Sequence, residues 1–373
     1  MPIDEAAKVA GVPVDRIEAW ERGDEKPPLG KLQALAAKYK RPLAVMFLPE
    51  PPRDFQALRD FRRVDPAEAA MPPRVALEIR VAQERRELLL DMVQETGEEP
   101  PAFVLTAEVG EDVEAVADRV RSYFGIAPGD QARWARRKQV FDGWRARIEA
   151  KGVLVFVMGG PHAPAVREVR GFAIPARHFP VAAVNGKDKT NGRTFSLLHE
   201  VVHLALGQAV VENAISTYRR LPAAERAVER FCNAVAAAVL MPKAAMAEIA
   251  VRFGKGPDAE WTDPEINDAA DWLGASREAV VLRAVALGFA GWRFYAAKRP
   301  RFEEEYAKLD EPSGKSVPVP SYMTMVNRYG RPFARAVFAA YRDRRITMND
   351  AAAFLEVQAK RIDYVARQAM AGA

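Results

Sequence analysis

His199 and His203 are the residues whose types and spacing point most directly to chemistry. They belong to the sequence H-E-V-V-H at positions 199–203, and on a helix residues four positions apart lie on the same face. Two imidazoles on one face can bind one metal ion, and Glu200 beside them can act as a general base for hydrolysis. The alternative is a pair of core histidines satisfied by their neighbours, but the adjacent glutamate would then be costly to bury without a metal. We therefore predict a metal site with His199 and His203 as ligands and Glu200 as the catalytic residue.

The surrounding sequence predicts the elements that would position this site. Residues 194–206 are largely apolar and are followed by Gly207, which indicates a buried helix with a glycine stop. Pro222 suits the first turn of a second helix that runs to about Leu240. The expected fold class is α+β and mostly helical, with a small β-sheet beside the histidine helix. Three segments rich in β-branched and aromatic residues predict its strands: residues 153–157, 169–174 and 180–184.

A catalytic zinc site needs one more protein ligand and an open position. The second helix offers Glu225, Glu229 and Cys232, which share one face by their spacing. Cys232 would be a soft ligand, yet a small buried thiol also packs well among apolar residues. Spacing alone does not choose between the two carboxylates. Two imidazoles and a carboxylate suit Zn²⁺, and Mn²⁺ or Fe²⁺ would also fit such a site.

Residues 229–242, E-R-F-C-N-A-V-A-A-A-V-L-M-P, follow the histidine helix and resemble the ImmA/IrrE family of metallopeptidases. Residues 180–185 also resemble the strand that leads to the metal helix in that family. The resemblance extends over about residues 108–250 and implies a zincin-like core with zinc as cofactor. It further implies that Glu229 is the third ligand, with Glu225 beside the ligands or on the surface. Peptidases of this family typically cut a helix-turn-helix repressor, which releases genes for stress response or mobile-element transfer.

The expected mechanism is metal-assisted peptide hydrolysis. The metal would polarise the scissile carbonyl and activate water, while Glu200 takes a proton and passes it to the leaving amine. The strand that ends at Asn185 would pair with an extended substrate and hold one peptide bond over the metal. His162, in a Gly-Gly-Pro-His-Ala-Pro loop, is expected to lie on the surface. The candidates for stabilising the oxyanion are Tyr218, His178 and Arg193.

The flanking segments resemble helix-turn-helix modules. The sequence W-E-R-G at 20–23, with residues 41–49, is similar to the XRE-type module fused to some family members, although the copy begins at what should be its second helix. Its would-be recognition helix has three acidic residues against two arginines, so neutralising DNA phosphates would gain little. We therefore favour a protein-docking or regulatory role over DNA reading. Residues 264–290 resemble the helix-turn-helix that follows the peptidase in other members.

Proline pairs and changes in pattern divide the chain into five parts. The last part carries nine lysines and arginines among aromatic residues between 328 and 367, which would suit nucleic acid, an acidic partner or a solvated helix pair. The expected parts are a helix-turn-helix-like segment (1–55), a helical linker (56–107), the metallopeptidase domain (108–250), a second helix-turn-helix-like segment (251–295) and a basic helical region (296–373).

The composition is that of an ordinary globular protein, with 373 residues, 28% charged residues and a net charge of +5. A single cysteine, no visible signal peptide and no membrane-length apolar run lead us to expect a cytoplasmic location away from membranes. The leading hypothesis is a zinc-dependent endopeptidase whose partner is a helix-turn-helix repressor. The alternatives are a DNA-binding regulator or a toxin-antitoxin component whose peptidase-like core does not cleave.

Overall fold

A computed structural model describes residues 3–39, 46–47, 71–136, 139–160, 163–208, 210–212, 222–307 and 321–370. The chain divides into two compact units, residues 1–57 and 58–373, and each is described separately. The five-part division expected from the sequence stays a prediction.

The first unit consists of three short helices around a small apolar cluster. Ala6, Ala7 and Ile17 are buried in this cluster, and Gly23 ends the second helix with a positive φ of 79°. The segment is helical, as a helix-turn-helix-like module requires, whereas its XRE-type character stays a prediction. The helices are α1 (Ile3–Ala10), α2 (Val14–Arg22) and α3 (Leu29–Tyr39).

The second unit is built on a four-stranded sheet in the order β1-β3-β2-β4. β1 and β3 are parallel, and the other two pairs are antiparallel. Every residue of β1, β2 and β3 is buried, which explains why these strands read as continuous apolar runs. The three predicted strands are confirmed, and β4 was not predicted. The strands are β1 (Leu154–Met158), β2 (Gly171–Ile174), β3 (Val181–Asn185) and β4 (Val210–Glu212).

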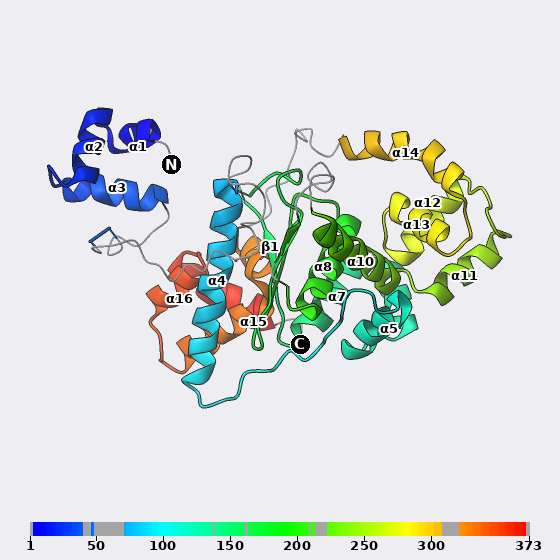
Figure 1. Ribbon diagram of the computed structural model, residues 1–373. Coiled ribbons are helices and arrows are strands. Elements are labelled where there is room, and N and C mark those ends of the chain that lie inside the picture. The colour runs from blue at the N-terminus through cyan, green and yellow to red at the C-terminus, as the bar shows by residue number, and fades with distance from the viewer. Residues whose placement is uncertain are drawn as a thin grey trace. The chain divides into compact units, whose positions relative to one another are not determined.

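Helices cover both faces of the sheet, so the second unit has three layers (Figure 1). Side chains alternate along a strand: Val155 and Val157 of β1 enter one apolar core, while Leu154, Phe156 and Met158 enter the other. The core that contains Val155 is formed with α5 (Val113–Tyr123), α6 (Pro128–Arg136), α7 (Val140–Glu149), α8 (Thr190–Ala205), α10 (Ala223–Leu240), α11 (Lys243–Arg252), α12 (Asp263–Leu273), α13 (Arg277–Ala286) and α14 (Trp292–Ala307).

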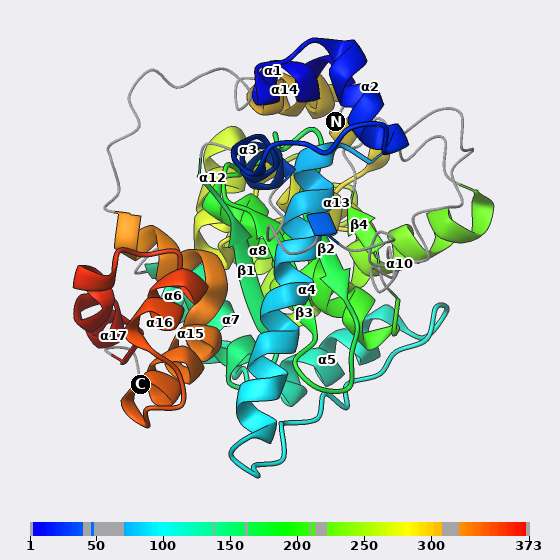
Figure 2. The same cartoon turned by 90° about the vertical axis from the view of Figure 1, so that its left-hand side faces the viewer.

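The opposite face of the sheet is covered by segments that lie far apart in the sequence. Figure 2 shows α4 crossing over the strands beside α15. Gly330 lets α15 bend against β1 and α7, because a Cβ there would lie 2.8 Å from Glu149 Oε1 and 3.2 Å from the Val155 carbonyl oxygen. These covering helices are α4 (Pro73–Gln94), α15 (Ser321–Arg342), α16 (Met348–Phe354) and α17 (Ile362–Met370), with a 3₁₀ turn at Ala359–Arg361.

The helices that carry the site lie on the first face. α8 packs against β2, β3 and α10, and α10 packs against both α8 and α5. No single helix of the described ranges is long and apolar enough to cross a membrane. The consecutive helices α10 and α11 meet that criterion of length and composition only as a pair, and they are bent by 60° at their junction.

Candidate metal centre

The helix α8 holds His199, Glu200 and His203 in the interior of the unit. Leu197, Leu198, Val201 and Val202 surround them in the same helix and join the core between α8 and its neighbours. The side chains of both histidines and of Glu200 have no exposed surface. A buried helix at this position is confirmed.

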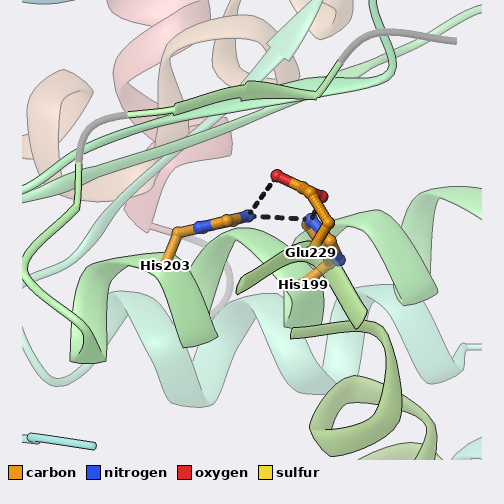
Figure 3. Close-up of side chains that lie close together, drawn as sticks. All are labelled: His199, His203 and Glu229. Atoms are coloured by element: carbon orange, nitrogen blue, oxygen red, sulfur yellow. Dashed lines mark hydrogen bonds and ion pairs between the residues drawn. The ribbon is translucent and has the colours of Figure 1, made fainter. Parts of the chain in front are cut away.

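Glu229 of α10 completes the cluster. Its carboxylate oxygens lie 3.3 Å from His199 Nε2 and 3.5 Å from His203 Nε2, and the two Nε2 atoms lie 2.9 Å apart. Figure 3 shows the carboxylate directed at both imidazole rings. The three residues form a group that could hold a metal ion, with all ligand atoms within 4.8 Å of one another.

The donor set and its spacing suit zinc. Four tetrahedral ligands at about 2.0–2.1 Å from zinc lie about 3.3 Å from one another. The distances from the two Glu229 oxygens to the Nε2 atoms, 3.3 and 3.5 Å, match this spacing, whereas the two Nε2 atoms, 2.9 Å apart, lie closer together. Three protein ligands leave one coordination position for water or substrate, which is the pattern of a catalytic rather than a structural zinc site.

The electrostatics of the cluster also favour metal binding. Burial, with a further contribution from neighbouring His199, holds the pKa of His203 well below its usual value. The imidazole is therefore neutral at neutral pH, and the neutral form is the one that binds metal. Glu229 is the partly exposed member of the cluster, with 14% of its side chain accessible, whereas the two histidine side chains have no exposed surface.

Glu200 occupies a space that a glycine leaves open. A Cβ at Gly171, the first residue of β2, would lie 2.5 Å from Glu200 Oε1 and 2.8 Å from the Ala183 carbonyl oxygen. These distances are below the contact distance of real side chains, so the carboxyl group lies directly over the glycine. Sequence reasoning did not single out Gly171. The signal in the sequence was a glycine at the start of an otherwise apolar strand. A glycine at such a position often marks the close approach of another group to the strand's backbone.

The other candidate ligands lie outside the cluster. Glu225, one turn before Glu229 on α10, is not a member of the group of three. Cys232 also belongs to α10, but its Sγ lies 3.6 Å from His203 Nδ1, the ring nitrogen that does not face Glu229. Among the described residues, the structure thus brings together His199, His203 and Glu229 and leaves Cys232 beside them.

Two oxyanion candidates have other contacts. His178 Nδ1 lies 3.0 Å from the Pro100 carbonyl oxygen, in a bridge between two loops. Arg193 hydrogen-bonds Thr190 through Nη2 at 3.1 Å and lies over the Phe141 ring. Tyr218 and His162 lie outside the described residues.

The prediction that the strand ending at Asn185 pairs with substrate is wrong. β3 lies between β1 and β2, and its backbone is paired on both sides. The Asn185 side chain is itself buried and donates hydrogen bonds to the carbonyl oxygens of Pro164 and Val169. An added strand needs a free edge, and β4 provides such an edge in the sheet as described.

Comparison with known proteins gives one family. Residues 149–284, just over a third of the chain, match the model of the IrrE N-terminal-like domain, a peptidase family. The matched range contains the H-E-x-x-H helix and Glu229. No curated protein matches the chain. The match supports a peptidase of the ImmA/IrrE type.

Proposed function

We propose that this protein is a zinc-dependent endopeptidase that cleaves a helix-turn-helix transcriptional repressor and so derepresses stress-response or mobile-element genes. The observation that carries the proposal is the convergence of His199, His203 and Glu229, next to the buried Glu200, inside the range that matches a peptidase family. The repressor as substrate rests on the resemblance to the ImmA/IrrE family.

The chain's own residues divide the chemistry between them. His199, His203 and Glu229 would hold the metal, which when bound polarises a peptide carbonyl and makes water a stronger acid. Glu200 would accept the proton of the attacking water and deliver it to the leaving amine, a contribution of about 10²–10⁴ in rate. Because Glu200 is fully buried, its carboxylate would act at low local dielectric, where its charge interactions are strong.

The edge strand β4 suits an extended peptide substrate. Gly171 of β2 lies against Glu200 and pairs with Glu212 of β4. The backbone of β4 is therefore about one strand spacing, roughly 4.8 Å, from the strand that contacts the catalytic residue. A peptide added to this edge would gain main-chain hydrogen bonds and would run about two strand spacings, roughly 10 Å, from β2.

The contacts of several arginines favour a peptidase over a DNA-binding regulator. Arg16 and Arg22 of α2 form ion pairs with Glu25 and Asp24 at 3.2 and 2.8 Å. Arg283 of α13 is buried and pairs with Glu114 at 2.7 Å. The buried Arg283 is therefore not available to phosphates, whereas the exposed Arg16 and Arg22 pairs lower the electrostatic gain on binding DNA only slightly.

The proposal is tested by incubating the zinc-loaded protein with a proteome-derived peptide library and labelling newly formed amino termini for mass spectrometry. A panel of helix-turn-helix repressors from the same genome is assayed in parallel for cleavage at a single site. We expect new termini with the wild type and a loss of at least about 10²-fold with Glu200→Gln, while zinc content is unchanged. Equal products from both proteins, or none from fully zinc-loaded wild type, would overturn the proposal.

A further inference from the structure

Cys232 lies on the far side of the His203 ring from the proposed metal position. Its Sγ is 3.6 Å from Nδ1, whereas Glu229 Oε1 is 3.5 Å from Nε2. Glu229 and Cys232 are three residues apart on α10, so they lie on the same face of that helix. One turn of α10 therefore contacts both nitrogens of a single imidazole that belongs to α8.

The two ring nitrogens must have different roles when Nε2 binds a metal. A neutral imidazole has one N–H and one lone pair. If the lone pair of Nε2 faces the metal, the proton is on Nδ1, and a nearby acceptor can fix this tautomer and the ring orientation. Among the described residues, the thiol of Cys232 offers such an acceptor, 3.6 Å from Nδ1.

We propose that Cys232 is a positioning residue: its Sγ accepts the Nδ1–H of His203 and holds Nε2 toward the metal. This inference rests on the proposed function, because it assumes that the cluster binds zinc. Spacing alone left open whether Cys232 is a metal ligand. In this proposal Cys232 acts through His203 and is not a ligand. Cys232 is outside the group of His199, His203 and Glu229, whose ligand atoms lie within 4.8 Å of one another.

The burial of Cys232 supports this role. The residue has no exposed surface, so the N–H···S contact is shielded from competing water. A buried sulfur is a weaker acceptor than the carboxylates and carbonyls that commonly support metal-binding histidines. We therefore expect its contribution at the lower end of the 10–100-fold range seen for such partners, at about tenfold in zinc affinity.

The test compares Cys232→Ala with a matched control, Val239→Ala, in the full chain. Val239 is equally buried on α10, two turns beyond Cys232, and its truncation removes more volume. Zinc affinity is measured by competition with a chelator, and folding is checked by urea unfolding. We expect Cys232→Ala to weaken zinc binding about tenfold and Val239→Ala to leave it unchanged in the folded protein. Unchanged affinity in Cys232→Ala, or an equal loss in both variants, would overturn the inference.

Two spectroscopic readouts separate positioning from ligation. The chain has four histidines, so their ring signals can be assigned. In the zinc-loaded protein, a two-bond ¹H–¹⁵N spectrum should show His203 protonated on Nδ1. The chemical shift of that proton should change in Cys232→Ala. Cobalt-substituted wild type should lack an intense thiolate charge-transfer band. Such a band, lost in Cys232→Ala, would make Cys232 a ligand and contradict its positioning role. Wild type that binds no zinc would overturn both proposals, whereas zinc-binding wild type with an unaffected Cys232→Ala would overturn this inference alone.

Discussion

Glu225 and Glu229 stand one helical turn apart on α10, yet only Glu229 is grouped with the two histidines. The spacing of four residues predicts that both carboxylates share a helix face. Which of them reaches α8 depends on the register in which α10 packs against α8, because one helical turn is a shift of 5.4 Å. A single turn therefore separates the carboxylate that joins the candidate metal cluster from one that does not.

We predict that Glu229→Gln and Glu225→Gln differ in zinc affinity. Glu229→Gln keeps the shape of the side chain but removes its charge, so zinc binding should weaken by roughly tenfold or more. Glu225→Gln should bind zinc like the wild type. The measurement is a chelator competition on both purified variants, and equal affinities would contradict the assignment of Glu229 as the third ligand.

Much of the site could be predicted from the sequence because its two histidines and Glu200 lie within five residues of one helix. Helical geometry alone brings His199 and His203 to one face. Which residue of α10 joins the site depends on tertiary packing. Glu229 was implied by the resemblance to a family and not by spacing. The contact of Cys232 with Nδ1 rather than with the ligand group likewise depends on packing, so no pattern of residue types predicts it.

At the scale of elements, the sheet supports the histidine helix α8, and its edge strand β4 is where we propose that an extended substrate adds. The start of β2 contacts Glu200 through Gly171, and β4 continues the sheet beyond β2. The three longer strands could be predicted since each is a continuous apolar run. β4 has three residues, V-V-E, which is too short for a pattern, and α6 has the mostly polar sequence P-G-D-Q-A-R-W-A-R. These two elements are formed by their neighbours more than by local preference.

We predict that Gly171→Ala displaces Glu200 and lowers peptidase activity by about 10²-fold, the effect of misplacing a catalytic group by about 1 Å. The added methyl would lie 2.5 Å from Glu200 Oε1, and its three nearest atoms belong to Glu200 and Ala183 rather than to the three proposed metal ligands. Zinc affinity should therefore change much less than activity.

Gly159→Ala is the matched control, because among the described residues a Cβ at Gly159 would meet the Val157 carbonyl oxygen alone, at an ordinary contact distance of 3.8 Å. Activity and zinc content are measured for both variants. Full activity in a folded Gly171→Ala protein would contradict the placement of Glu200 against β2.

At the scale of the whole molecule, the sheet face opposite the metal site is covered by α4 and by the C-terminal helices. Charged residues join this layer: Arg328 pairs with Glu78 at 3.2 Å, and Arg85 pairs with Glu356 at 2.8 Å. In the sequence, α4 and the C-terminal helices look like a charged linker and a basic tail. Arg328 and Glu78 are separated by 250 positions, so their ion pair leaves no local pattern in the sequence. Two cations of the tail, Arg328 and Arg345, which donates to the Met92 carbonyl oxygen, therefore serve the fold, which reduces the charge available for nucleic acid.

We predict that Phe333→Ala, in this covering layer, lowers the free energy of unfolding by about 3–5 kcal/mol. Phe333 has no exposed surface and packs beneath Tyr329 against the sheet face. Trp292→Ala is the control, since Trp292 is 68% exposed and its loss should cost less than about 0.5 kcal/mol. Urea unfolding of the metal-free proteins measures both. Equal stabilities would show that α15 is not part of the core.

The most direct test of the central claim is the zinc content of the purified protein, measured by native mass spectrometry on wild type and His199→Ala. The account predicts one zinc per chain in the wild type and its loss in His199→Ala, with circular dichroism showing both proteins folded. A folded wild type that contains no metal and takes up none from added zinc would contradict the account, because His199, His203 and Glu229 would then be a buried polar cluster without the metal that explains it.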